Sequence, residues 1–89
     1  MSANTSELAP ADRRLLDYLR ARPNRVHGRD ALLREVWGDA HTTPRSVDAS
    51  IARLRRSLGA GGTAIVTVRR VGYRLDPERL DPERLEPGG

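Results

Sequence analysis

Residues 43–58 have the sequence TPRSVDASIARLRRSL, and this stretch decides the fold. Its apolar residues recur at intervals of four, three and four, which places them on one face of an α-helix: Val47, Ile51, Leu54 and Leu58. Thr43 is a residue type that caps helices, and Pro44 suits the first helical turn. We therefore predict a helix over residues 44–58 with one buried face.

The opposite face of this helix carries small and cationic side chains. The same geometry directs the following residues away from the core: Arg45, Ser46, Ala49, Ser50, Ala52, Arg53 and Arg56. A solvated helix usually mixes acidic and basic residues at exposed positions, and this helix does not. Small side chains let a helix approach a DNA groove closely, while arginine reaches base edges or phosphates. We interpret this face as a DNA-contacting surface.

Two further helices are expected before it. Leu15, Leu16 and Leu19 form an apolar stripe of a first helix that ends near Ala21. Residues 25–27 form a short extended piece, and Gly28 then caps a second helix. The apolar positions of the second helix keep helical spacing up to Gly38, which ends it: Leu32, Leu33, Val36 and Trp37.

A β-hairpin is expected after the third helix. The glycine-rich residues 59–62 break the helix, and residues 63–68 are a β-branched run of strand type. Residues 69–72 form a turn before the short strand 73–75, and we expect Gly72 to supply a backbone conformation that other residues adopt reluctantly. The order of elements predicts an α+β, mainly α fold, a three-helix winged helix-turn-helix with a C-terminal β-hairpin wing.

Basic charge is concentrated in the middle of the chain. All 16 basic residues are arginine and the formal net charge is +4. Residues 45–74 contain seven arginines and one acid, Asp48, whereas residues 76–89 contain five acids and two arginines. A general preference for arginine over lysine would not explain why the middle block lacks acids. Arginines near phosphates release condensed counterions, so the block fits a nucleic-acid surface.

Several classes of function are excluded by composition. A chain of 89 residues has too small a core for a deep catalytic pocket, and it contains no cysteine for disulfides, thiolate catalysis or cysteine-ligated zinc. His27 and His41 lie outside any metal-ligand spacing, and we treat both as surface or capping residues. We expect no enzyme activity, no cofactor and no metal. The chain has neither a membrane-spanning stretch nor a signal-peptide pattern, which predicts a cytoplasmic protein.

Three regions follow from this pattern. Residues 1–7 are expected to be a flexible arm, residues 8–75 the DNA-binding domain, and residues 76–89 an acidic, mostly disordered tail with a DPERL repeat. The tail is by default a solvated appendage. A second hypothesis has its charge fold back over the basic face and compete with phosphates.

The chain resembles the effector domain of OmpR/PhoB-type response regulators over about residues 8–75. The likeness is carried by LAPAD at 8–12, NRV at 24–26, LLREVWG at 32–38, RSVD at 45–48 with Ile51, Leu54, Arg55 and Leu58, and TVR at 67–69 followed by GYRL at 72–75. In that family the third helix enters the major groove, a wing arginine reaches the minor groove, and a tryptophan of the second helix lies near a phosphate.

The resemblance implies a set of contact residues. Groove contacts fall on Arg45, Ser46, Ala49, Ser50, Arg53 and Arg56, the wing contact on Arg69, and backbone contacts on Trp37, Thr67 and Tyr73. Arg70 joins them because a hairpin tip has little structural need for two adjacent cations. The family usually has a four-stranded sheet before the first helix and a receiver domain, and neither is expected here. The first helix would then expose a face for a partner or a homodimer.

Alternatives stay open at this point. Helical spacing after Leu33 favours a core position for Trp37 over a phosphate contact. Asp48 most simply favours the helix dipole, and a base contact or an arginine salt bridge is its alternative. The favoured function is a double-stranded DNA-binding transcription regulator, with RNA polymerase or another transcription protein as a further partner. The alternative is a protein-interaction module that binds a transcription-related or phage-type partner.

Overall fold

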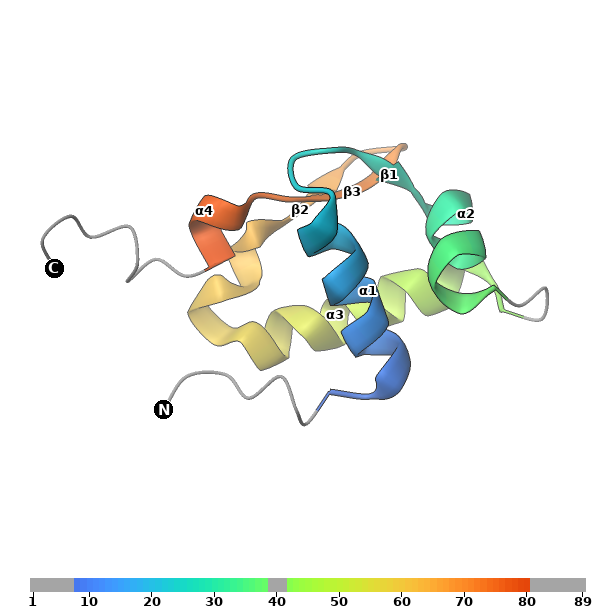
Figure 1. Ribbon diagram of the computed structural model, residues 1–89, viewed down its shortest axis with the longest axis horizontal. Coiled ribbons are helices and arrows are strands. Elements are labelled where there is room, and N and C mark those ends of the chain that lie inside the picture. Colours follow the sequence, from blue (N-terminus) through green and yellow to red (C-terminus); the bar gives the residue numbers. More distant parts are fainter. Residues whose placement is uncertain (1–7, 39–41, 81–89) are drawn as a thin grey trace, which may run out of the picture.

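Three main helices and one short C-terminal helix pack around a small antiparallel sheet in the computed structural model, which describes residues 8–38 and 42–80 (Figure 1). The helices are α1 (Pro10–Ala21), α2 (Arg29–Leu32), which continues as a π-helical turn (Leu33–Trp37), α3 (Pro44–Leu58) and the short α4 (Pro77–Leu80). The strands are β1 (His27–Gly28), β2 (Ile65–Val68) and β3 (Gly72–Leu75). The predicted winged helix-turn-helix order is therefore confirmed.

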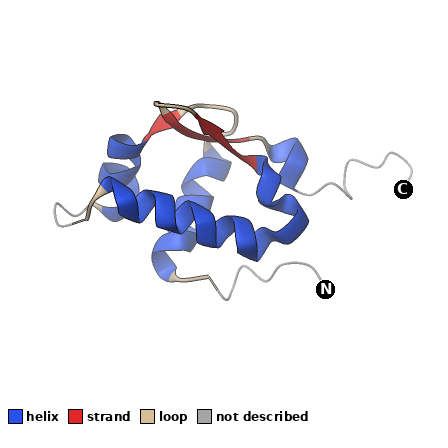
Figure 2. Cartoon of the chain, turned by 180° about the vertical axis from the view of Figure 1, so that it is seen from behind, coloured by secondary structure: helices blue, strands red, loops and turns tan. Residues whose placement is uncertain are grey.

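The core lies where α1 crosses α3 beneath the sheet (Figure 1). Its fully buried side chains come from the stripes expected on α1, α2 and α3 and from the strands: Leu15, Leu16, Leu19, Leu32, Val47, Ile51, Leu54, Ile65 and Leu75. Burying each such side chain contributes roughly 1.5–3 kcal/mol, so these contacts dominate the stability of the fold. Figure 2 shows the other side of the molecule, where no described element covers α3.

β3 is the central strand of the sheet, between β1 and β2. His27 pairs with Tyr73 and Gly28 with Gly72, so the short extended piece before α2 joins the wing in one sheet, a pairing that the sequence did not reveal. A Cβ atom at position 72 would collide with the carbonyl oxygen of His27. Gly72 is thus required for a close approach of two strands. The expectation of an unusual φ was wrong, and the positive φ at the tip belongs to Arg70, at 67°.

The end of α3 differs from the expected simple break. Gly59 ends the α-helix with a φ of 58°, but the chain continues as a 3₁₀ turn (Gly59–Ala64) before β2 begins at Ile65. The strand is therefore two residues shorter than the predicted 63–68. Thr43 precedes α3 as expected, although its side chain makes no capping hydrogen bond and only its carbonyl accepts from Ser46.

The fold extends beyond residue 75. Asp76 donates its amide to the carbonyl of Ala64, and Leu80 of α4 packs against the core. The prediction of a mobile tail is wrong for residues 76–80. The arm at 1–7, residues 81–89 and His41 lie outside the described residues, and the statements about them stay predictions.

The exposed face of α1 is polar. Its exposed positions include Arg13, Arg14, Asp17 and Arg20, and Val26 and Val71 are the exposed large apolar side chains among the described residues. The expected use of this face by a partner or a second copy stays a prediction. Within residues 8–38 and 42–80, no helix has the length and apolar character needed to span a bilayer.

Candidate nucleic-acid interface

The outward side of α3 and the wing tip carry exposed arginines. Arg45, Arg56, Arg69 and Arg70 are exposed, and their side chains make no ion pair or hydrogen bond within residues 8–38 and 42–80. Ala49 and Ala52 are exposed between the α3 arginines, Ser46 is half-buried, and Thr67 is exposed on β2. We call Arg45, Arg56, Arg69 and Arg70 the four unpaired arginines.

A shallow cleft separates the start of α3 from the wing. It is lined by Pro44 of α3, by residues of β1 and α2, and by Thr67, Arg70 and Tyr73 of the wing. The two predicted contact elements are thus neighbours, which is the arrangement that binding to one duplex requires.

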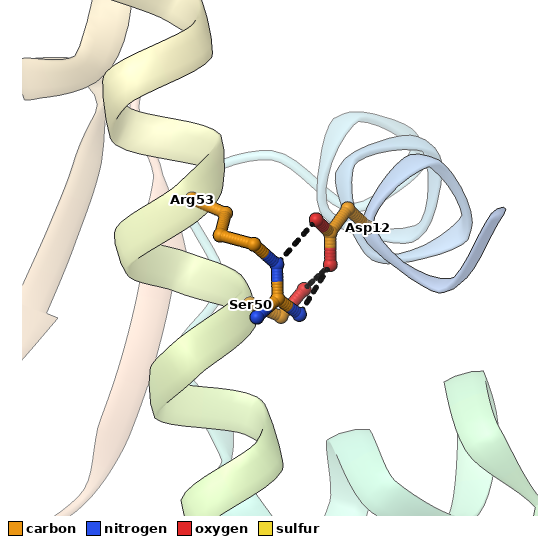
Figure 3. A network of polar contacts seen from close by, with 3 residues as sticks. All are labelled: Asp12, Ser50 and Arg53. Carbon is orange, nitrogen blue, oxygen red and sulfur yellow. Dashed lines mark hydrogen bonds and ion pairs between the residues drawn. The ribbon is translucent and has the colours of Figure 1, made fainter. Parts of the chain in front are cut away.

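Arg53 and Ser50 are engaged with α1 (Figure 3). Arg53 donates from Nε and Nη2 to the two carboxylate oxygens of Asp12, at 2.8 and 3.0 Å, and Ser50 Oγ donates to Asp12 Oδ1. Ser50 is fully buried, so its predicted outward position and groove contact were wrong: α1 crosses α3 at this level and covers it. Arg53 remains half exposed, with its Nη1 outside the bonds to Asp12.

Asp12 is a buried, charged anchor for α3. Burial by itself would raise the pKa of Asp12, but the hydrogen bonds from Arg53 and Ser50, together with the charge of Arg53, hold the pKa below its usual value. The same hydrogen bond raises the pKa of Arg53. The carboxylate of Asp12 therefore balances the positive charge of Arg53. This ion pair joins α1 to α3 in the free protein.

Asp48 also has a different role from the expected one. It lies past the first turn of α3, where its Oδ2 accepts from Arg29 Nη1 at 2.8 Å and its Oδ1 accepts from the hydroxyl of Tyr73 at 2.6 Å. The helix-dipole interpretation was wrong, and the alternative of an arginine salt bridge is what the structure contains. Burial and the hydrogen bond to Asp48 raise the pKa of Tyr73 to about 12.

Arg55 fastens the base of the wing to α3. It donates from Nε and Nη2 to the carbonyl of Ile65, at 3.2 and 2.6 Å, and from Nη2 to Thr67 Oγ1 at 2.8 Å. Arg55 carries part of the family resemblance, but no contact was predicted for it from the sequence. The signal that could have found it is a long donor side chain on the side of α3 next to a strand.

Trp37 is half-buried and packs against the core, as its helical spacing suggested. It is the last residue of the π-helical turn. Gly38 closes this turn with a φ of 62°, and its amide N–H donates a hydrogen bond to the carbonyl of Leu33. Arg14 of α1 donates to the carbonyl of Val36 at 3.3 Å, so α1 holds this end of α2. Nothing in the sequence pattern indicated the π-helical geometry.

His27 was expected at the surface and is instead buried in β1. The imidazole ring of His27 meets the ring of Tyr18 edge-on, with 5.2 Å between their centroids. The guanidinium of Arg22 lies over the ring of Tyr18, 4.0 Å from its centroid. This cluster lies at the junction of α1 and the sheet and has a packing role.

Comparison with known proteins places the chain in a family. The family model described as "Transcriptional regulatory protein, C terminal" matches residues 3–75. The phosphate regulon transcriptional regulatory protein PhoB of Escherichia coli (strain K12) is 41% identical over 72 residues, which cover 78% of this chain and 31% of that protein. The transcriptional regulatory protein AfsQ1 of Streptomyces coelicolor is 45% identical over 75 residues, covering 80% and 33%. The chain spans about a third of the length of these relatives.

Solved structures show the same fold. The DNA-binding domain of the response regulator AdeR, in complex with an intercistronic region, superimposes with a TM-score of 0.71 at 28% identity, covering 79% of this chain and 72% of that one. The DNA-binding domain of Klebsiella pneumoniae RstA, in complex with the RstA box, gives 0.67 at 37% identity, covering 79% and 73%. With the matched family model and the shared fold, the chain belongs to the OmpR/PhoB-type C-terminal domains of transcriptional regulatory proteins.

Proposed function

We propose that this chain binds double-stranded DNA as the DNA-binding part of a transcription regulator, with α3 in the major groove and the wing on the adjacent minor groove or backbone. The observation that carries the proposal is the uncovered side of α3, where Arg45, Ala49, Ala52 and Arg56 are all exposed beside a wing tip with two more arginines. The DNA complexes of the AdeR and RstA domains support it.

The predicted contacts divide into two kinds. Arg45, Ser46 and Ala49 belong to the part of α3 that would meet base edges, where small side chains permit close approach. Phosphate and minor-groove contacts are assigned to Arg56, Arg69, Arg70, Thr67 and Trp37. Arg53 contributes through Nη1 alone, because Nε and Nη2 are bonded to Asp12. For Tyr73 a phosphate contact would compete with its bond to Asp48.

The broader context of the domain belongs to the same proposal. The family consists of transcription regulators, and we propose no catalytic activity for this chain. We propose that the whole regulator binds RNA polymerase or another transcription protein, and that it pairs with a second copy of itself. We propose a cytoplasmic location for it. A single module of this size makes a small contact area, so two copies on adjacent DNA sites would bind more specifically than one.

Salt-dependent binding tests the proposal. The affinity for a labelled duplex is measured by fluorescence anisotropy at several salt concentrations, for the natural chain and for Arg56→Ala and Arg69→Ala. If Arg56, Arg69 and Arg70 each neutralise a phosphate, the slope of log affinity against log salt is about −2.7, and each substitution reduces its magnitude by about 0.9. The matched control is Arg20→Ala, which removes the same charge from an exposed position of α1.

Two outcomes contradict the proposal. The first is the absence of duplex binding at low salt. The second is an equal effect of Arg20→Ala, Arg56→Ala and Arg69→Ala, because net charge rather than this surface would then determine binding.

A further inference from the structure

A single carboxylate of α3 joins three elements at the root of the wing tip. Asp48 accepts one bond from Arg29, the first residue of α2, and one from Tyr73 of β3. Arg29 follows β1 directly, and β1 pairs with β3 at Tyr73 and Gly72. Asp48 is therefore bonded to β3, one of the two strands from which the tip of the wing projects, and to α2, which follows the neighbouring strand β1.

The wing is joined to α3 through both of its strands. Arg55 bonds to β2 at Ile65 and Thr67, and Thr67 is the register partner of Tyr73. The Asp48–Tyr73 bond is the side-chain hydrogen bond from α3 to β3 among the described residues. In the turn between β2 and β3, the amide N–H of Val71 donates a hydrogen bond to the carbonyl of Val68. The turn residues Arg69, Arg70 and Val71 are all exposed. The position of the tip relative to α3 thus depends on Asp48 on the β3 side and on Arg55 on the β2 side.

We infer that Asp48 is a positioning residue for DNA binding: it fixes the wing tip at the distance from α3 at which both elements engage the same duplex. The inference rests on the proposed function and assigns Asp48 no contact with DNA. Holding the tip in place before binding reduces the conformational entropy lost when the complex forms. This gain opposes the unfavourable effect of an anion close to phosphates.

The two effects of Asp48 have opposite signs, which makes the inference testable. If Asp48 acted only as an anion, its removal would tighten DNA binding, because one repulsive charge would be gone. If it positions the wing, its removal weakens binding, and the loss depends on the wing-tip contact. Arg69→Ala removes that contact and supplies the second side of a double-mutant cycle.

The experiment measures duplex affinity for the full chain, Asp48→Ala, Arg69→Ala and the double variant, with thermal unfolding of each variant to establish the folded fraction. We expect Asp48→Ala to weaken binding about five- to tenfold in the natural background and less than about twofold in the Arg69→Ala background. Tighter binding of Asp48→Ala overturns the inference. So does an equal loss in both backgrounds, since Asp48 would then act independently of the wing tip.

A second measurement needs no DNA. Amide ¹⁵N relaxation of the free protein reports order at Arg69 and Val71, and we expect lower order parameters there in Asp48→Ala, with α1 unchanged. Tyr73→Phe, which removes only the hydroxyl that bonds to Asp48, provides the milder variant and is expected to loosen the same amides. Unchanged tip order in both variants overturns the inference. Failure of the natural chain to bind duplex would instead overturn the proposed function.

Discussion

Replacing Arg53 by alanine should destabilise the fold as well as weaken DNA binding. The substitution removes two charge-assisted hydrogen bonds, at 2.8 and 3.0 Å, from a carboxylate whose side chain is 3% exposed, and it leaves Asp12 with Ser50 as its side-chain donor. Breaking a buried pair by removing one partner costs about 3–5 kcal/mol. Because the Arg53 side chain is itself 49% exposed, solvent screening lowers the expected cost to about 2 kcal/mol.

The pH dependence of this cost identifies its origin. In the natural chain the pKa of Asp12 lies below its usual value, so the ionised carboxylate stabilises the fold above about pH 4, and this contribution is lost as the pH falls through the lowered pKa. Without Arg53 only the hydrogen bond from Ser50 opposes the effect of burial, so the pKa of Asp12 rises. The difference in unfolding free energy between the two proteins should therefore be full at pH 7 and shrink as the pH falls toward 3.

Urea unfolding followed by circular dichroism at pH 7 and at acidic pH measures both effects. Arg56→Ala is the matched control, because Arg56 is an exposed arginine of the same helix with no ion pair among the described residues, and its change should stay within about 0.5 kcal/mol. If Arg53→Ala costs no more than Arg56→Ala, or costs the same at both pH values, the assignment of Arg53 as the partner of a buried charge is refuted.

Four further substitutions test the wing and the end of α3. Gly72→Ala should disrupt the β1–β3 pairing, because its Cβ would collide with backbone, and should lower the free energy of unfolding by more than about 3 kcal/mol. Gly59→Ala has open space around its Cβ and should cost only about 1 kcal/mol of backbone strain. Thermal unfolding measures both costs. Arg70→Gly should raise stability by about 1 kcal/mol by relieving the φ of 67° and should weaken duplex binding, whereas weaker binding without added stability would mean that the turn is unstrained. The raised pKa of Tyr73 means that its neutral phenol stabilises the fold below about pH 10, and this contribution is lost between about pH 10 and 12. Tyr73→Phe should therefore remove this loss from the pH profile of the unfolding free energy. An unchanged alkaline profile would show that Tyr73 titrates normally.

The sequence predicted the elements that depend on local periodicity. The spacing of Val47, Ile51 and Leu54 located the buried face of α3, and Gly38 correctly marked the end of the second helix. The hairpin followed from a β-branched run, a turn and a short strand, all within 13 residues of chain from 63 to 75. Such features are determined by neighbours in the sequence, so a single chain suffices to predict them.

The polar contacts around the candidate interface depend on tertiary geometry instead. Ser50 and Arg53 are 38 and 41 residues from Asp12, and only the crossing of α1 over α3 brings them together. On a helical projection both residues belong to the outward face, so periodicity assigned them to DNA. Asp48 is a similar case, because its partner Tyr73 lies 25 residues away in the sheet. Sequence analysis found the cations of the site, but not which of them the protein already uses.

An amide chemical-shift titration with duplex DNA locates the surface of the protein that binds. We expect the largest shifts along the outward side of α3, at Arg45, Ala49 and Arg56, and at the wing-tip residue Arg69, with little change at Arg20 of α1. Shifts concentrated on α1 or α4, with α3 and the wing tip unaffected, would contradict this expectation.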